Sequence, residues 1–267
     1  MDPAVRELLA HLRFRGTIRE RSVEPVVRLL RAVRERRRIR GLLLDISSGG
    51  GGSVPSEELY LAVRRLSAVK PVVASIGSIG ASGGYLAAIG ARRVFAYPDS
   101  AVGSIGVLYP HFAVKGLLDR LGIEVELLHQ GRHKDAYQGY RPLTEEERGK
   151  MLGMAEEGYR GFVETVARER KKTVEEILPL ATGEVFTGTT AARLGLIDAL
   201  GDPEEALEEL ARLTGVPSRR TVRIEPPRPF LERLLAGGVR SVGPSLREGL
   251  SDAFDDLAFE ALGGSGR

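Results

Sequence analysis

The chain has 267 residues, of which 42% are hydrophobic and 28% are charged, a balance typical of a soluble globular protein. It contains no cysteine, which excludes disulfides and thiol chemistry, and its formal net charge of +3 gives no reason to expect a nucleic-acid partner. No apolar stretch reaches the roughly 18 residues that a transmembrane helix needs, and residues 1–6 lack the layout of a signal peptide. We therefore expect a cytoplasmic protein or one attached peripherally to a membrane.

The first half of the chain alternates short apolar runs with helical patterns. Strands are predicted at residues 8–14, 41–46, 72–76 and 94–96. Helices are predicted at residues 23–37, from Pro55 onward, and at 85–89, where small residues follow a glycine-rich turn. Because strands and helices alternate, we expect an α/β fold with a largely parallel sheet and helices on its faces.

The second half is richer in helical patterns. Residues 102–107 predict a glycine-punctuated turn into a strand, residues 112–121 a helix, and residues 123–128 a further strand. After a polar loop at 129–142, Thr144 and Glu147 have the spacing of a capping box that begins a long helix ending near Lys171. Shorter helices are predicted at 174–180, 190–194 and 203–213.

Prolines at residues 226, 227 and 229 indicate a linker between the α/β pattern and the C-terminal region. We expect residues 1–224 to form the α/β domain, and residues 225–267 to form a linker, one or two amphipathic helices within 230–262 and a disordered tail.

Ser82 is the first candidate functional residue. It follows a buried strand, has Ala81 and Gly83 as small neighbours, and opens a helix. The N–H groups and the dipole at a helix start favour negative charge, and small neighbours let a substrate backbone approach. A serine in this place is equally well explained as a helix N-cap, so the segment alone leaves both interpretations open.

A second glycine-rich segment, residues 49–52, follows the strand predicted at 41–46. Because the carboxyl ends of parallel strands meet at one edge of a sheet, this loop is expected beside Ser82, where a backbone N–H could bind an oxyanion. The segment lacks the Gly-Lys-Ser/Thr ending of a phosphate-binding loop, which argues against a nucleotide site.

A serine nucleophile also needs a proton acceptor. Histidine is the usual one, and a lysine can replace it when burial lowers the lysine pKa. The polar loop after residues 123–128 contains His129, His133 and Lys134, again at the expected carboxyl end of a strand. The residues by themselves leave all three open as the base.

Several blocks of the sequence resemble one family. Gly80-Ala81-Ser82-Gly83-Gly84-Tyr85 is similar to the nucleophile motif of the signal peptide peptidase A family (family S49), whose members are Ser/Lys peptidases of the ClpP/crotonase fold. The resemblance extends over about residues 8 to 212. Its further blocks, in the order in which the family has them, are residues 45–51, 102–107, 131–135, 158–163, 183–188 and 191–198.

The resemblance implies a ClpP/crotonase-like parallel-sheet core of repeated β-β-α units with helices on its faces and a C-terminal helical extension. It implies that Ser82 is the nucleophile, that Lys134 is its general base and that Ser104 orients the lysine. It also implies an oxyanion hole formed by the N–H groups of Gly50 and Gly83, with no metal and no cofactor.

Members of this family assemble into ring-like homo-oligomers, so we expect that Lys134 can reach Ser82 of a neighbouring subunit. The implied substrates are remnant signal peptides or other short hydrophobic or unfolded peptides. The sequence departs from the family at Gly49, where the family has proline, and it lacks the usual N-terminal membrane anchor. We therefore expect a soluble form or one attached through the basic run at 34–40 or the apolar C-terminal residues.

Three alternatives remain open. The first is a Ser/His peptidase of the same fold that uses His129 or His133 as its base. The second is an acyl-CoA hydratase-like enzyme, because this fold supports glycine-loop oxyanion holes in that class too. The third is a non-catalytic scaffold.

Overall fold

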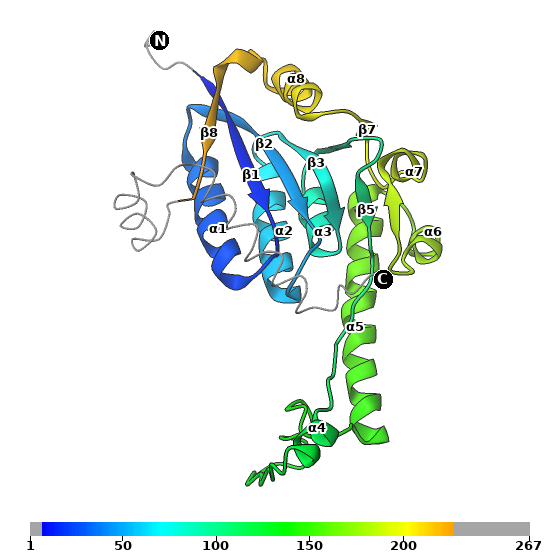
Figure 1. The fold of residues 1–267 in the computed structure, drawn as a ribbon. Coiled ribbons are helices and arrows are strands. Elements are labelled where there is room, and N and C mark those ends of the chain that lie inside the picture. Colours follow the sequence, from blue (N-terminus) through cyan, green and yellow to red (C-terminus); the bar gives the residue numbers. More distant parts are fainter. Residues whose placement is uncertain (1–6, 227–267) are drawn as a thin grey trace, which may run out of the picture. The chain divides into compact units, whose positions relative to one another are not determined.

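The computed structural model describes residues 7–226, and those up to residue 225 belong to one compact unit (Figure 1). The strands are β1 (Leu8–Arg15), β2 (Ile39–Ser48), β3 (Val72–Ala81), β4 (Arg93–Ala96), β5 (Ala101–Gly103), β6 (Val185–Thr187), β7 (Ala199–Leu200) and β8 (Thr221–Ile224). The helices are α1 (Glu20–Glu35), α2 (Ser53–Ser67), α3 (Gly83–Ile89), α4 (Lys115–Arg120), α5 (Glu145–Arg170), α6 (Val174–Ile177), α7 (Gly188–Arg193) and α8 (Pro203–Thr214), with the 3-10 turns η1 (Leu178–Leu180) and η2 (Ser218–Arg220).

The strands form one mixed sheet in which parallel pairing dominates. Its order is β6-β5-β3-β2-β1-β8, and β4 joins β3 to β7 beside this path. Among the described strands the only antiparallel pair is β5 with β6. The predicted α/β class and parallel sheet are therefore confirmed.

Strand β3 changes its partner along its length. Residues 73–76 pair with β4, and residues 79–81 pair with β5, so the strand leaves one neighbour and joins the next after Ile76. Its register with β2 also shifts, between Ile46 and Ser48. As a result the carboxyl ends of β2, β3 and β5 meet at Ser82, the residue directly after β3.

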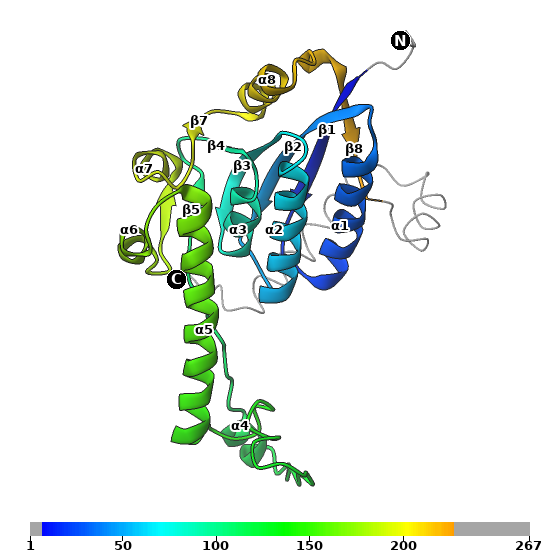
Figure 2. The same ribbon diagram turned by 180° about the vertical axis from the view of Figure 1, so that it is seen from behind.

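Helices cover both faces of the sheet. Helices α1, α2 and α3 lie side by side on one face, as Figure 2 shows from behind. Helix α8 packs on the opposite face, where Leu210 contacts the cluster that contains Leu43 and Val73. Burial on both faces explains why β2 reads as a continuous apolar run rather than as an alternating pattern.

The long helix α5 begins with the predicted capping box. The Thr144 hydroxyl accepts a hydrogen bond from the Glu147 N–H at 3.3 Å, and the Glu147 carboxylate accepts one from the Thr144 N–H at 2.8 Å. The buried apolar residues of α5 are Val163, Val166 and Ala167, all in its C-terminal half. Figure 1 shows that its N-terminal half leads away from the sheet toward α4.

Two predictions in this region are wrong or only partly right. Residues 123–128 form no strand and are exposed throughout, although Ile123, Val125 and Leu127 alternate with glutamates. No other strand of the described chain lies alongside to provide hydrogen bonds, and a lone strand is not stable. The helix predicted at 112–121 is reduced to α4.

The short strands β6, β7 and β8 were not predicted, because two to four residues carry little periodicity. The helices predicted within residues 230–262 lie outside the described residues. Within residues 7–226 we find no helix whose length and hydrophobicity would let it span a bilayer.

Candidate active site

Ser82 lies at the junction between β3 and α3. Its N–H donates to the carbonyl oxygen of Gly103 at 2.8 Å, and its carbonyl oxygen accepts from the N–H of Leu86 at 2.9 Å. These bonds hold the Ser82 backbone at a φ of 49° and a ψ of −123°, which residues with a side chain rarely adopt. Backbone strain of this kind costs about 1–3 kcal/mol and collects at functional sites.

The hydroxyl of Ser82 does not cap the helix. Ser82 occupies the N-cap position of α3, yet its side chain accepts no hydrogen bond from the first helical turn. A capping serine normally accepts one from the second or third N–H of the helix. The N-cap interpretation therefore does not account for this serine, and its Oγ is available for chemistry.

Gly50 lies directly against Ser82. Its φ is +100°, and a β-carbon built on it would lie 2.9 Å from Cβ and 3.1 Å from Oγ of Ser82, and 2.8 Å from the nitrogen of Gly83. Glycine is thus required here both by the backbone conformation and by space. The Gly50 N–H donates to Oγ of Ser48 at 3.1 Å, a partner that it must exchange in order to bind an oxyanion.

Gly83 and Ser104 complete the group. Gly83 is the first residue of α3, where an N–H has no intrahelical acceptor, so it can donate to a ligand. Ser104 follows Gly103, which pairs with Ala81 next to Ser82. Its φ is also 49°, so two strained serines end two adjacent strands at the same edge of the sheet.

A pocket of about 740 Å³ opens at this edge and contains both Ser82 and Ser104. Its volume is within the usual range for a ligand site. The lining residues are mostly small or apolar: Gly49, Gly51, Ser53, Ser82, Ser104, Gly106, Val107, Leu108, Leu152, Ala155, Glu156, Tyr159, Ala181, Thr182 and Gly183. Glu156 is the one carboxylate among them, so the lining is largely uncharged.

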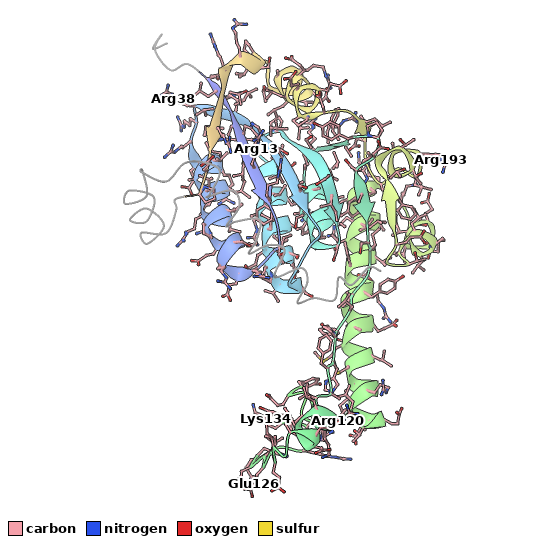
Figure 3. All side chains as sticks on the ribbon, viewed as in Figure 1. Arg13, Arg38, Arg120, Glu126, Lys134 and Arg193 are labelled. Carbon is pink, nitrogen blue, oxygen red and sulfur yellow. The ribbon has the colours of Figure 1, made fainter. Side chains whose placement is uncertain are left out.

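Lys134 does not line this pocket. It is exposed, and Figure 3 shows it beside α4, at the end of the molecule away from the sheet. His129 and His133 lie in the same loop, and no lysine or histidine of residues 7–226 is among the lining residues. The chain therefore brings together Ser82, Gly50, Gly83 and Ser104, but not a base.

The wall that α5 contributes was not foreseen. Leu152, Ala155, Glu156 and Tyr159 recur at helical spacing, so a shared helix face could have been recognised. Nothing in the sequence indicates that this face turns toward Ser82. The hydroxyl of Tyr159 donates to the carbonyl oxygen of Ala181 at 2.9 Å, which ties this wall to residues 181–183, a second segment that lines the pocket.

Replacing Gly50 tests the contact with Ser82. For the peptide cleavage that the sequence resemblance implies, we expect Gly50→Ala to lower kcat/KM by at least about 100-fold, because its methyl group would displace the Gly83 N–H and the Ser82 side chain. Gly161→Ala is the matched control, since nothing lies within 4 Å of a β-carbon at that position of α5. Steady-state cleavage and thermal melting measure both variants. Wild-type activity in Gly50→Ala would contradict this arrangement.

Comparison with known proteins identifies relatives along the whole chain. The sequence model of peptidase family S49 matches residues 64–217 of this chain, a range that contains Ser82, Ser104 and Lys134. A Synechocystis sp. protein named "Putative protease slr0021" is 33% identical over 259 residues, which cover 96% of this chain and 93% of that protein.

Two further relatives are longer proteins. The Arabidopsis thaliana protein named "Serine protease SPPA, chloroplastic" is 28% identical and matches 90% of this chain but 38% of its own length. "Protease 4" of Salmonella typhi is 34% identical and matches 66% of this chain and 28% of its own length. The chain thus spans well under half of these two relatives.

A solved structure supports the fold. A mutant of the 1510-N membrane-bound stomatin-specific protease superposes with a TM-score of 0.52 at 12% identity, covering 83% of this chain and 99% of that one. The expected ClpP-like α/β fold is thereby confirmed. Because the family match covers more than half of the chain and the Synechocystis relative is similar over nearly its full length, this protein belongs to peptidase family S49 and is a serine-type peptidase.

Proposed function

We propose that the protein is a homo-oligomeric endopeptidase in which Ser82 is the nucleophile and Lys134 of a neighbouring subunit is the general base. The observation that carries the proposal is the uncapped hydroxyl of Ser82, held on a strained backbone in a pocket with Ser104 and in contact with Gly50. A serine held in this way is typical of a nucleophile at a strand-to-helix turn.

The proposed reaction is an acyl transfer. A neutral Lys134 amine accepts the proton of Ser82 Oγ while Oγ attacks the carbonyl carbon of the scissile peptide bond. The N–H groups of Gly50 and Gly83 stabilise the oxyanion, by about 3–4 kcal/mol per donor in comparable sites. The ammonium then protonates the leaving amine, and water, deprotonated by the same lysine, hydrolyses the acyl-enzyme. The Ser104 hydroxyl orients the lysine.

The need for a second subunit follows from where the base lies. The pocket has no lysine or histidine from its own described chain, whereas the segment that carries Lys134 exposes many apolar side chains. The most exposed are Leu108, Phe112, Leu117, Leu121, Leu128 and Leu152. Exposed apolar side chains gathered in one segment are typical of an interaction site. Since Leu108 and Leu152 also line the pocket, a second copy bound there can bring its Lys134 to Ser82.

The proposed substrates are short hydrophobic or unfolded peptides, including remnants of signal peptides. Val107, Leu108 and Leu152 offer apolar contacts, and the glycines near Ser82 admit an extended backbone.

The Ser/His alternative is less well supported. His129 lies 3.9 Å from the Asp135 carboxylate, and His133 lies 3.3 Å from that of Glu146. Both rings thus contact carboxylates of their own loop region, and neither histidine lines the pocket that contains Ser82. The hydratase-like and scaffold alternatives are disfavoured by membership of a peptidase family.

Substitutions in the loop test the assignment of the base. With fluorogenic peptides that carry small and apolar side chains, we expect Lys134→Ala to lower kcat by about 1,000-fold or more. Lys134→Arg should be equally inactive, because arginine keeps the charge but cannot deprotonate. His129→Ala and His133→Ala should stay within about tenfold of wild type. An active Lys134→Ala together with an inactive histidine variant would overturn the assignment.

A further inference from the structure

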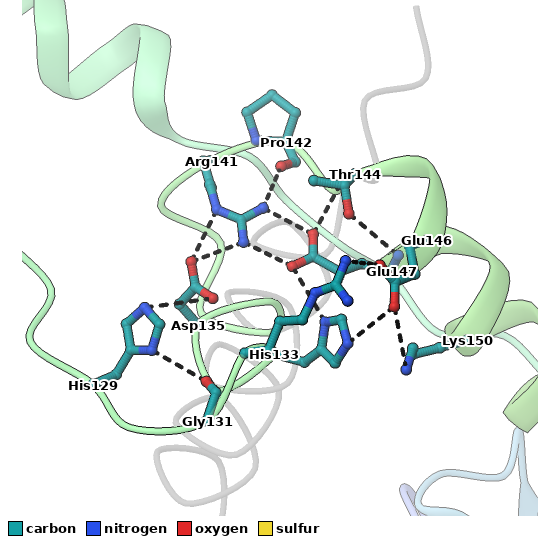
Figure 4. A network of polar contacts seen from close by, with 11 residues as sticks. His129, Gly131, His133, Asp135, Arg141, Pro142, Thr144, Glu146, Glu147 and Lys150 are labelled. Carbon is teal, nitrogen blue, oxygen red and sulfur yellow. Dashed lines mark hydrogen bonds and ion pairs between the residues drawn. The ribbon is translucent and has the colours of Figure 1, made fainter.

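Lys134 lies in a run of four consecutive ionisable residues, and its neighbours are all paired. Arg132 pairs with Glu146, His133 Nε2 lies 3.3 Å from the same carboxylate, and Asp135 pairs with Arg141 (Figure 4). Within residues 7–226 the Lys134 side chain makes no hydrogen bond or ion pair, and it is exposed. The loop thus engages every charge around the amine but leaves the amine itself without a partner.

Arg141 is the centre of this network. Its Nε donates to Oδ2 of Asp135 at 2.9 Å, and its two terminal nitrogens donate to the two carboxylate oxygens of Glu147 at 2.8 and 2.7 Å. Nη1 also donates to the carbonyl oxygen of Pro142 at 3.0 Å. The bidentate geometry with Glu147 is one that a lysine could not reproduce. One guanidinium therefore bridges the residue next to Lys134 and the first turn of α5.

The two carboxylates are shielded from water, unlike the amine. The side chain of Glu147 is 4% exposed and that of Asp135 is 13% exposed, while Arg141 is 33% exposed. Glu147 is further held by the N–H of Thr144 at the start of α5. The hydrogen bonds from Arg141, followed by that from Thr144, hold the pKa of the Glu147 carboxyl far below its usual range. The ion pair therefore stays intact at neutral and alkaline pH.

Removing Arg141 would leave two carboxylates without their partner beside Lys134. Because Lys134 is next to Asp135 in the sequence and its amine has no partner among the described residues, the amine could then pair with a carboxylate that Arg141 otherwise occupies. An amine that is paired with a carboxylate is not free to accept the proton of Ser82. The groups that face this part of the loop are His129, Arg132, His133, Asp135, Arg141, Glu146, Glu147 and Lys150.

We propose that Arg141 is a positioning residue that engages Asp135 and Glu147 and so keeps the Lys134 amine free for Ser82. The inference rests on the proposed function, in which Lys134 is the base. Arg141 itself touches neither Ser82 nor the pocket, and it acts by holding the loop to α5 and by balancing its charge.

The pH dependence of peptide cleavage tests this role. The assay uses the full-length protein and a fluorogenic peptide and records kcat/KM as a function of pH. We expect Arg141→Gln to shift the rising limb of this pH profile to higher pH by about one unit or more. At neutral pH kcat should fall at least about tenfold with little change in KM, and most of it should return at the alkaline plateau. Adding Asp135→Asn and Glu147→Gln to Arg141→Gln removes the uncompensated charge and should move the limb back toward wild type.

Two further variants keep the test decisive. Arg141→Lys retains the charge without the bidentate geometry, so its limb should stay close to that of wild type even if its activity is lower. Arg148 is the matched control, because it lies one residue beyond Glu147 and pairs with Glu145 at 3.5 Å instead. Arg148→Gln should leave the profile unchanged.

The outcomes separate the two proposals. A loss in Arg141→Gln that is equal at every pH, without recovery in the triple variant, would show a merely structural role and overturn the inference. An unchanged profile would overturn it as well. If Lys134→Ala retains activity, the proposed base itself is wrong. If Lys134→Ala is inactive while Arg141→Gln behaves as wild type, only the inference is wrong.

Discussion

Ser82→Ala is expected to lower kcat/KM for peptide cleavage by about 10,000-fold or more, because loss of the nucleophile removes the covalent route. The fold should be retained, since alanine has a β-carbon like serine and Oγ makes no capping bond whose loss would destabilise α3. Steady-state cleavage of fluorogenic peptides measures the first effect. Thermal melting measures the second, and we expect a melting temperature close to that of wild type.

A second substitution of Ser82, by glycine, tests separately whether the backbone at this position is strained. Ser82→Gly should be as inactive as Ser82→Ala but more stable, by about 1 kcal/mol, because glycine accepts a φ of 49° without strain. Ser78→Ala is the matched serine control on β3: its hydroxyl bonds to that of Ser47 at 2.8 Å, outside the pocket. Equal cleavage by wild type and Ser82→Ala would overturn the role of Ser82 as the nucleophile.

Mixing two inactive variants should restore activity. If Ser82 works with Lys134 of a neighbouring subunit, a mixed oligomer of Ser82→Ala and Lys134→Ala contains sites with both residues intact. In a random equimolar mixture such a site needs an intact serine on one subunit and an intact lysine on the next. About one quarter of wild-type activity is therefore expected. Co-expression of the two variants, followed by purification and steady-state assay, measures the recovery.

The control for this experiment pairs Ser82→Ala with the double variant Ser82→Ala/Lys134→Ala, which has no intact serine and should remain inactive. If the lysine acts within its own chain, no mixed site has both groups and the first pair remains inactive too. That result would contradict a base supplied by a neighbour. Recovered activity should also fall on dilution below the concentration at which the oligomer dissociates.

Much of the fold follows from local patterns in the sequence. The runs at 41–46 and 72–76 are β2 and β3, and Thr144 with Glu147 begins α5 as the capping box indicates. These features can be predicted from the sequence because hydrophobic periodicity and capping chemistry act over a few residues. The same holds for the small residues around Ser82, which indicate a candidate site before any contact is known.

The strand predicted at 123–128 is an example of a feature that local sequence patterns cannot predict. Its alternating pattern is real, but a strand needs a partner, and the described chain has none beside it. Whether an apolar alternation becomes a strand depends on residues far away in the sequence or in another molecule. Local periodicity carries no information about such a partner.

The sequence by itself determined the parallel α/β class, the nucleophile candidate and the glycine loop, because each depends on local chemistry at a strand end. Only the tertiary structure decided that Ser82 does not cap its helix, that β3 changes partner just before it, and that α5 forms a wall of the pocket. It also separated Lys134 from the pocket and joined its loop to α5 through Arg141. These features depend on contacts between distant segments, which are set by packing and long-range hydrogen bonds rather than by the residues on either side.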